Sequence, residues 1–269
     1  MNIFCVFLFF LMGLLCGTLL NLIINAVSMD GKRSLVATCC TRCQTRWNML
    51  YLMPVAGYFF TKGYCPSCKA KTTVRVPLVE FSVGLIFALL HWKYGLSWEL
   101  WMLILYFAIL IILLVTDLER YLLPNVITYP AVLLALALSL AVMLMGYSPQ
   151  WAWNFANGGI MAIMNNYFIN ALVGGLSGAL LLFAVAVISR GGMALGDVKL
   201  AGLMGLMMGF PLIMVALFLG VIAGGLVAIG LIVSKRKKRK EMMPFGPFIC
   251  MASMVTLVWG KDLLTWYLS

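Results

Sequence analysis

Cysteine spacing defines the first candidate site in this sequence. Cys40 and Cys43 form one Cys-x-x-Cys pair, and Cys65 and Cys68 form a second pair further along the chain. Each pair can supply two thiolates from one tight turn, and two such pairs close a tetrahedral zinc site. Disulfides and a single redox-active pair are other uses of cysteines spaced in this way. The two matched pairs favour structural Zn²⁺ bound by all four cysteines.

Two aspartates form the second candidate site, because an ionisable group inside an apolar stretch is costly. Asp117 lies at the end of a long apolar run, and Asp197 lies just before the shorter apolar run Lys199–Phe210. As a helix, the shorter run would span only about 18 Å, so a helix that crosses a bilayer must also include Asp197. Both carboxylates are then expected at the same depth.

A facing pair of carboxylates would give this protein the chemistry of an aspartic peptidase. Two such groups cannot both ionise comfortably, so one holds a proton and the other does not. The ionised member takes a proton from water while the protonated member polarises a peptide carbonyl. The residues alone leave a second interpretation open, in which Asp117 pairs with Arg120 and Asp197 caps a helix next to Lys199.

Other kinds of functional site find less support in the sequence. Gly175–Gly178 reads Gly-Leu-Ser-Gly and is similar to the serine motif of rhomboid peptidases, but the one histidine, His91, is predicted in a short outer loop. Close packing of helices through these glycines is the simpler interpretation. A single histidine also excludes metallopeptidase chemistry of the HExxH type. A proton- or cation-coupled transporter, with the two aspartates as its ion site, is the alternative to an enzyme.

Composition places these sites in a membrane protein. Hydrophobic residues are 64% of the 269 and charged residues are 10%, whereas soluble domains have about half and about a quarter. Runs of about 20 apolar residues match the hydrocarbon core of a bilayer. The sequence therefore predicts an all-α polytopic membrane protein with about eight transmembrane helices, at Ile3–Val27, Pro77–Trp92, Glu99–Asp117, Val126–Met145, Asn170–Ser189, Gly192–Phe210, Pro211–Val233 and Pro247–Tyr267. Its expected parts are a first helix at 1–28, a zinc-binding segment at 29–76 and a seven-helix membrane peptidase domain at 77–269.

The distribution of charge predicts the orientation of these helices. Of the 19 Lys and Arg residues, all but Lys93 and Lys261 fall on one side of the predicted helices. The positive-inside rule makes that side cytosolic and places both termini outside. Disulfides are therefore disfavoured in the segment 29–76. The basic run Lys235–Lys240 is expected to contact anionic lipids rather than nucleic acid, because no aromatic residues are interleaved with the basic ones.

Taken together, these features resemble the type IV prepilin peptidase family, membrane aspartic enzymes that cleave the leaders of type IV pilins and type II secretion pseudopilins. The resemblance covers nearly the whole chain. The segments that carry the resemblance are the double Cys-x-x-Cys, Val76–Glu80, Thr116–Asn125, Leu195–Leu200 and Pro244–Phe248. The resemblance implies catalytic roles for Asp117 and Asp197, and it implies a zinc-type segment around the four cysteines.

The same resemblance implies a location, a second activity and a substrate contact. It implies cleavage of basic leaders at the cytosolic face of the bacterial inner membrane, followed by N-methylation of the new terminus with S-adenosylmethionine. Because these leaders end in basic residues, Glu80 is predicted to bind one of their cations. The chain departs from the family at Ala194, where a glycine is usual, and at Asn125, where an acidic residue is common.

Overall fold

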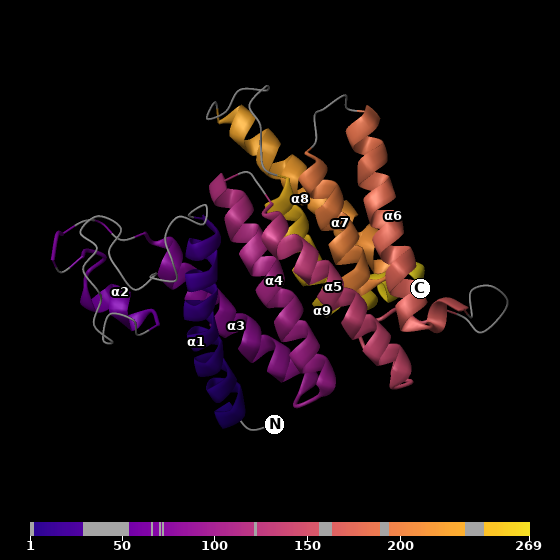
Figure 1. Ribbon diagram of the computed structural model, residues 1–269, viewed down its shortest axis with the longest axis horizontal. Helices are drawn as coiled ribbons and strands as arrows, with labels where there is room; N and C mark the ends of the chain where they lie inside the picture. Colours follow the sequence, from indigo (N-terminus) through magenta and orange to yellow (C-terminus); the bar gives the residue numbers. More distant parts are fainter. Residues whose placement is uncertain are drawn as a thin grey trace. The chain divides into compact units, whose positions relative to one another are not determined.

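The described part of the chain is helical. The computed structural model describes residues 3–28, 54–65, 67–69, 71, 73–120, 123–155, 163–188, 194–234 and 245–269. Within those residues, the helices are α1 (Ile3–Ser28), α2 (Ala56–Phe60), α3 (Arg75–Tyr94), α4 (Trp98–Arg120), α5 (Asn125–Leu144), α6 (Tyr167–Ile188), α7 (Leu195–Met208), α8 (Leu212–Val233) and α9 (Gly246–Leu268) (Figure 1). The only strand-like pairing among them is an isolated antiparallel bridge between Tyr64 and Lys71. For the described residues, the predicted all-α fold is confirmed.

Seven of these helices are long and apolar enough to cross a membrane. They are α1, α3, α4, α5, α6, α8 and α9, and each begins and ends within three residues of its predicted position. The exception is α7, which was predicted as a full span from Gly192 to Phe210 but has 14 residues as a helix. At 1.5 Å per residue it covers about 21 Å, less than the hydrocarbon core of a bilayer. The predicted eight spans are therefore seven candidate spans and one shorter helix in the described residues.

The chain divides into two compact units, Met1–Ala108 and Ile109–Ser269, and α4 runs through the division. In the first unit, α1 and α3 pack side by side and run in opposite directions. Gly13 and Gly17 face α3 so closely that a Cβ on Gly17 would lie 2.6 Å from the Cα of Glu80. Further along the same pair, the ring of Phe9 stacks on His91 with centroids 4.2 Å apart, so His91 lies buried in α3 and not in the short outer loop predicted for it. Small residues spaced by four thus let the two helices approach closely.

In the second unit, α6 packs along α7 (Figure 1). A Cβ on Gly174 would lie 2.6 Å from the carbonyl oxygen of Gly205, and a Cβ on Gly178 would lie 2.9 Å from that of Ala201. The hydroxyl of Ser177 donates to the carbonyl of Gly174, in its own helix. The Gly-Leu-Ser-Gly motif is therefore part of a helix contact, as the simpler interpretation predicted.

Two side chains of α6 hold the end of α7. Tyr167 donates its hydroxyl to the carbonyl of Met207 at 2.7 Å, and the side chain of Asn170 accepts from the backbone N–H of Phe210 at 2.6 Å. Gly209 has a φ of 75° and follows the last residue of the helix, as is usual at a helix end. A short helix can end among apolar neighbours because these polar groups bind its terminal backbone.

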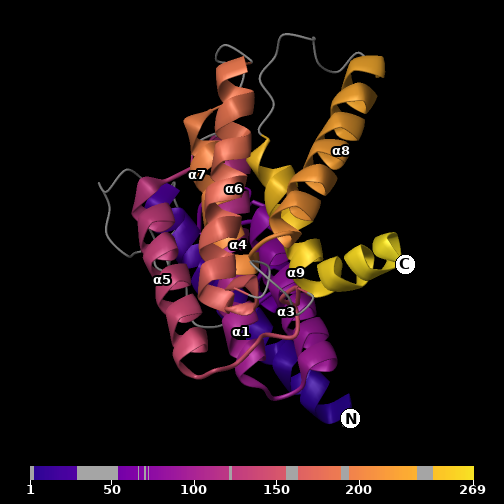
Figure 2. The same cartoon turned by 90° about the vertical axis from the view of Figure 1, so that its right-hand side faces the viewer.

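After this turn the chain reverses into α8. Figure 2 shows α8 inclined away from α6, so that the C-terminal ends of these two helices lie apart. The direction of the chain alternates through α6, α7 and α8 (Figures 1 and 2). The N-terminal end of α7 therefore lies at the same end of the second unit as the C-terminal ends of α6 and α8.

Candidate active site

Asp117 and Asp197 come from two helices that run in opposite directions. Asp117 lies three residues before the C-terminal end of α4, and Asp197 lies in the first turn of α7. An acidic residue in a first turn interacts favourably with the helix dipole. The residue before α7 is Ala194, with φ −76° and ψ 140°. This is extended backbone that any residue adopts, so the departure from the family's glycine introduces no backbone strain here.

Gly246, the first residue of α9, shows that the two carboxyl groups face the same small space. A Cβ at this glycine would collide with Oδ2 of Asp117 and would lie 3.5 Å from Oδ1 of Asp197. Both aspartates therefore border one point that the glycine leaves open. Residues far apart in sequence are thus brought together, as the prediction of a shared depth requires.

Burial makes this pair electrostatically unusual. Asp117 is 5% exposed and Asp197 is 7% exposed. Oδ2 of Asp117 has no hydrogen-bond partner among the described residues. Burial, and then repulsion by the charge of Asp117, raise the pKa of Asp197 to about 6. Asp197 belongs to α7, which is not one of the candidate spans. A carboxyl group that titrates in this range can hold a proton in one step and release it in another.

The alternative in which Asp197 caps a helix beside Lys199 is not what the structure shows. Ala194, not Asp197, is the N-cap residue of α7. The ammonium of Lys199 donates to Oδ1 of Asn125 and to the hydroxyl of Tyr129, both at 3.2 Å. It also lies 5.2 Å from the centre of the Tyr129 ring. Lys199 thus joins α7 to α5, and Asn125 accepts one of these hydrogen bonds.

The second cysteine pair lies in a tight turn of the first unit. The backbone N–H of Lys69 donates to the carbonyl of Cys65 at 2.9 Å, and the bridge between Tyr64 and Lys71 closes the turn. Cys65 is buried and Cys68 is partly exposed. A turn of this kind can direct two thiolates at one metal ion, so this half of the predicted site fits Zn²⁺.

The first cysteine pair, Cys40 and Cys43, lies outside the described residues. Within the described ones, no three His, Cys, Asp or Glu residues gather around a point that could hold a metal ion. The four-cysteine zinc site therefore stays a prediction.

Glu80 is buried between α1 and α3, with 4% of its surface exposed. Its Oε1 accepts from the hydroxyl of Thr18 at 3.1 Å, and its Oε2 accepts from the backbone N–H of Val55 at 2.7 Å. Because Glu80 is buried, a substrate cation could reach its carboxylate only if the surrounding residues moved. The predicted contact with a substrate stays a prediction, and the structure gives Glu80 a second task, holding Val55.

Sequence reasoning did not assign a role to Gly246. The segment Pro244–Phe248 was recognised by resemblance, and a Gly-Pro pair at a helix start was visible in it. That pair indicates where α9 begins, because proline favours the first turn of a helix. It does not indicate that the missing side chain leaves room for two carboxylates from other helices.

Comparison with known proteins gives two matching family models. The bacterial peptidase A24 N-terminal domain matches residues 11–94, and the type IV leader peptidase family matches residues 104–229. The second match contains both aspartates, and the first contains all four cysteines of the predicted zinc site. No solved structure matches the chain significantly.

Several curated proteins are similar to the chain, and the following three are all named prepilin leader peptidase/N-methyltransferase. The protein from Aeromonas salmonicida strain A449 is 28% identical over 237 residues, covering 86% of this chain and 74% of the relative. The Bacillus subtilis protein is 27% identical over 229 residues, covering 85% and 84%. The Pseudomonas aeruginosa protein is 24% identical over 284 residues, covering 96% and 91%.

The matches run through the chain in order, and the seven candidate spans fit a protein that crosses the inner membrane several times. The matching families and relatives give no support to the transporter alternative. With both of its parts matched and most of its length aligned to these relatives, the chain belongs to the type IV leader peptidase family.

Proposed function

We propose that this chain is an aspartic endopeptidase that cleaves the basic leaders of type IV prepilins and type II secretion pseudopilins. The observation that carries this proposal is the meeting of Asp117 and Asp197 at Gly246. Family membership supports the substrate class, because the relatives are named prepilin leader peptidases. The distribution of Lys and Arg supports action at the cytosolic face of the membrane.

The proposed chemistry is hydrolysis with one proton shared by the pair. The ionised carboxylate removes a proton from a water molecule, whose oxygen attacks the scissile carbonyl carbon. The protonated carboxyl group donates a hydrogen bond to the carbonyl oxygen and stabilises the charge that develops there. The C–N bond then breaks, and the nitrogen leaves as an amine after it receives a proton from the pair. Burial and mutual repulsion support this division of roles, since they favour one proton between the two groups.

We also propose that Cys40, Cys43, Cys65 and Cys68 bind one structural Zn²⁺. The turn at Cys65 supports two of these ligands. A segment of this size buries little core, so a metal ion would contribute most of its stability. Metal analysis of the purified protein should give about one Zn²⁺ per chain. Retention of zinc after Cys65→Ser and Cys68→Ser together would contradict the proposal.

N-methylation of the new N-terminus, with S-adenosylmethionine as the methyl donor, is proposed from the relatives' names alone. No group of described residues is assigned to that cofactor. The methyl group would pass from the sulfonium to the amine that cleavage creates, which then loses a proton. Contact of the basic run Lys235–Lys240 with anionic lipids is likewise a proposal, supported by its charge.

A single assay tests both activities. Purified full-length protein is incubated with a prepilin-like peptide that carries a basic leader, with and without S-adenosylmethionine, and the products are weighed by mass spectrometry. We expect two fragments, and one added methyl group on the C-terminal fragment when the cofactor is present. The Asp117→Asn, Asp197→Asn double variant controls for contaminating peptidases. An intact peptide, or equal cleavage by that variant, would overturn the proposed peptidase.

A further inference from the structure

The hydrogen bond from Val55 to Glu80 fixes the depth at which α2 begins. Val55 directly precedes α2, and its N–H is held at 2.7 Å by a carboxylate buried between α1 and α3. The other oxygen of that carboxylate accepts from Thr18 of α1. Val55 has a φ of 58°, an uncommon conformation for a β-branched residue. The start of α2 is therefore attached to the sides of two helices.

That attachment lies well inside the ends of both helices. Thr18 is ten residues before the last residue of α1, and Glu80 is five residues after the first residue of α3. At 1.5 Å per residue these positions are about 15 Å and about 8 Å from the respective helix ends. Both α1 and α3 are candidate membrane spans. Figure 1 accordingly shows α2 level with α1 rather than beyond its C-terminal end.

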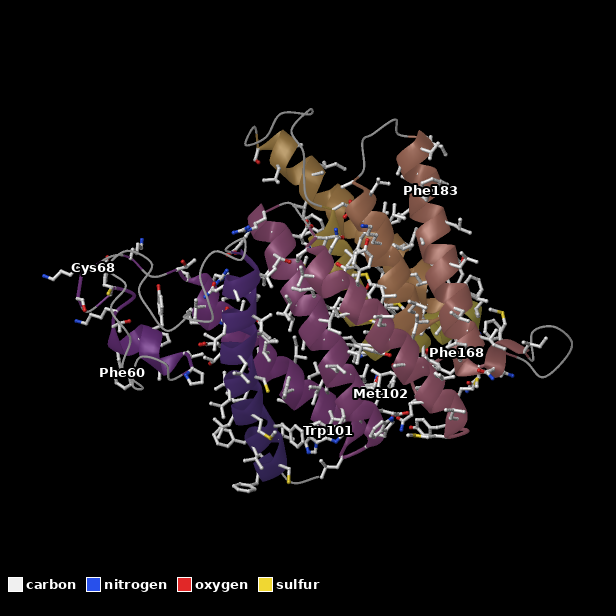
Figure 3. The ribbon with its side chains drawn as sticks, viewed as in Figure 1. Phe60, Cys68, Trp101, Met102, Phe168 and Phe183 are labelled. Carbon is white, nitrogen blue, oxygen red and sulfur yellow. The ribbon has the colours of Figure 1, made fainter. Side chains whose placement is uncertain are left out.

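At this level, α2 exposes two large aromatic side chains. Phe59 is 72% exposed and Phe60 is 74% exposed. In Figure 3, Phe60 lies at the side of this segment that points the same way as the N-terminal end of α1, and Cys68 lies at the opposite side. In water, two adjacent exposed phenylalanines would be unfavourable. At the boundary of a bilayer, the same exposure is favourable.

The residues that follow α2 carry positive charge. Lys62, Lys69 and Lys71 are all exposed, and they lie in the turn that also holds Cys65 and Cys68. Their long side chains can reach lipid phosphates while their stems cover apolar surface. Exposed aromatic residues at one side of a segment, with basic residues in the turn that follows them, are a combination that binds the surface of an anionic membrane.

We propose that Phe59, Phe60, Lys62, Lys69 and Lys71 form an interfacial anchor. The two phenylalanines enter the region between headgroups and acyl chains, and the three lysines contact the phosphates of anionic lipids. Glu80 sets the depth of this anchor through Val55. The cysteine turn is thereby held against the membrane surface rather than suspended in water. The anchor does not depend on whether the protein cleaves peptides.

The anchor can be tested with the full-length protein in lipid nanodiscs. An environment-sensitive fluorescent amino acid replaces Phe60 in one variant and Ser67, an exposed residue of the cysteine turn, in a matched control. We expect emission from position 60 to be shifted to shorter wavelength and to be quenched by lipids brominated near the headgroup end of their acyl chains. Emission from position 67 should be less shifted and less quenched.

The lipid headgroup is tested in the same system. Brominated phosphatidylglycerol should quench the probe at position 60 more strongly than brominated phosphatidylcholine. The Lys62→Gln, Lys69→Gln, Lys71→Gln variant should lose that difference while it keeps the quenching itself, because the phenylalanine at position 59 and the probe at position 60 still enter the lipid.

Three results would overturn the proposal. Equal, long-wavelength emission at positions 60 and 67 would place both in water. A short-wavelength signal at position 60 without lipid quenching, present only with two protein copies per disc, would identify a second copy as the covering partner. The same signal with one copy per disc would show that the protein's own chain covers Phe60.

Discussion

At the scale of residues, the pairing of two buried carboxyl groups costs stability. Asp117 and Asp197 are both buried, and one oxygen of Asp117 has no hydrogen-bond partner among the described residues. An arrangement chosen for stability alone would place apolar or paired side chains there. Buried ionisable groups that lower the stability of the folded protein are expected at functional sites.

That cost predicts a pH-dependent gain in stability for Asp197→Asn. The pKa of Asp197 is raised from its ordinary value of 3.8 to about 6 in the folded protein. The wild type therefore loses stability as the pH rises between these two pKa values. Asparagine does not titrate. The variant should therefore unfold at a higher temperature than the wild type at about pH 7.5, and the gain should shrink at about pH 4.5. Thermal unfolding in detergent measures both, with the exposed Glu119→Gln as control. A gain that does not change with pH would contradict the assigned ionisation.

Each aspartate should be indispensable for cleavage. Asn keeps the size and polarity of Asp but cannot exchange a proton, and members of one catalytic unit are not additive. Asp117→Asn and Asp197→Asn should each lower kcat for a prepilin-like peptide by at least about 10⁴-fold, and the double variant should be no worse. Glu119, two residues from Asp117 and exposed, is the matched control, and Glu119→Gln should keep most activity. Normal cleavage by both Asp variants would refute the pair.

Gly246 should be sensitive to the smallest possible side chain. A Cβ there would collide with Asp117 and approach Asp197, so Gly246→Ala should displace the pair. A displacement of about 1 Å can cost about 10²-fold in kcat. Gly225→Ala in α8 is the control, because nothing lies within 4 Å of its Cβ position. Kinetics that are the same for the two variants would show that the space at Gly246 is not needed.

Candidate residues could be predicted from the sequence where the type of side chain itself indicates the chemistry. Acidic residues beside apolar runs are rare enough that Asp117 and Asp197 could be selected from the sequence. Gly246 could not, because a glycine carries no chemical label and its role depends on which helix ends meet around it. The burial of Glu80 also escaped prediction, since a solvated helix end and a buried hydrogen-bonded carboxylate look alike in sequence.

At the scale of elements, hydropathy predicts long helices well and short ones poorly. The seven long apolar runs matched observed helices because each can satisfy its own backbone hydrogen bonds in lipid. Two elements were missed or misjudged. The C-terminal end of α7 is bound by Tyr167 and Asn170 of a different helix. The five residues of α2 directly follow Val55, whose N–H donates to a carboxylate distant in sequence, that of Glu80.

The contact between α6 and α7 predicts unequal effects of two similar substitutions. Gly205→Ala would drive a Cβ into the backbone of Gly174, whereas Gly202→Ala would meet its nearest atom at 3.5 Å. The first should destabilise the protein by about 1–3 kcal/mol through overpacking. The second should be neutral or slightly stabilising, because alanine favours helix over glycine. Apparent unfolding temperatures of the two variants in one detergent give the comparison. Equal values would place the close contact elsewhere.

At the scale of the whole molecule, the number of crossings decides on which side each loop lies. Although α7 is too short to be a candidate span, it reverses the chain direction between α6 and α8 (Figure 2). It therefore returns the chain to the end of the second unit where α8 begins, and the predicted placement of both termini on one side depends on this return. Charge supplied this prediction from the sequence, because Lys and Arg gather on one side of the helices.

Reporter fusions can measure this topology. A fusion after Lys62 should report the cytosol, and a fusion after Ser148, between α5 and α6, should report the opposite side. The reason is that an odd number of traverses, α3 to α5, separates the two points. Fluorescent protein and alkaline phosphatase at each point give complementary signals. If both points reported the same side, the assignment of α3, α4 and α5 as spans would be wrong.

Ribosomes make Val55 before they make Glu80, yet the first residue needs the second as its hydrogen-bond partner. At about 5–20 residues per second, the delay between the two is only a few seconds. The turn with Cys65 and Cys68 is itself synthesised during that interval, before the carboxylate to which the segment is attached. The segment can be fastened only after α3 has been synthesised and has packed against α1. During biogenesis, insertion of α3, the second candidate membrane span, must therefore precede completion of the cysteine segment.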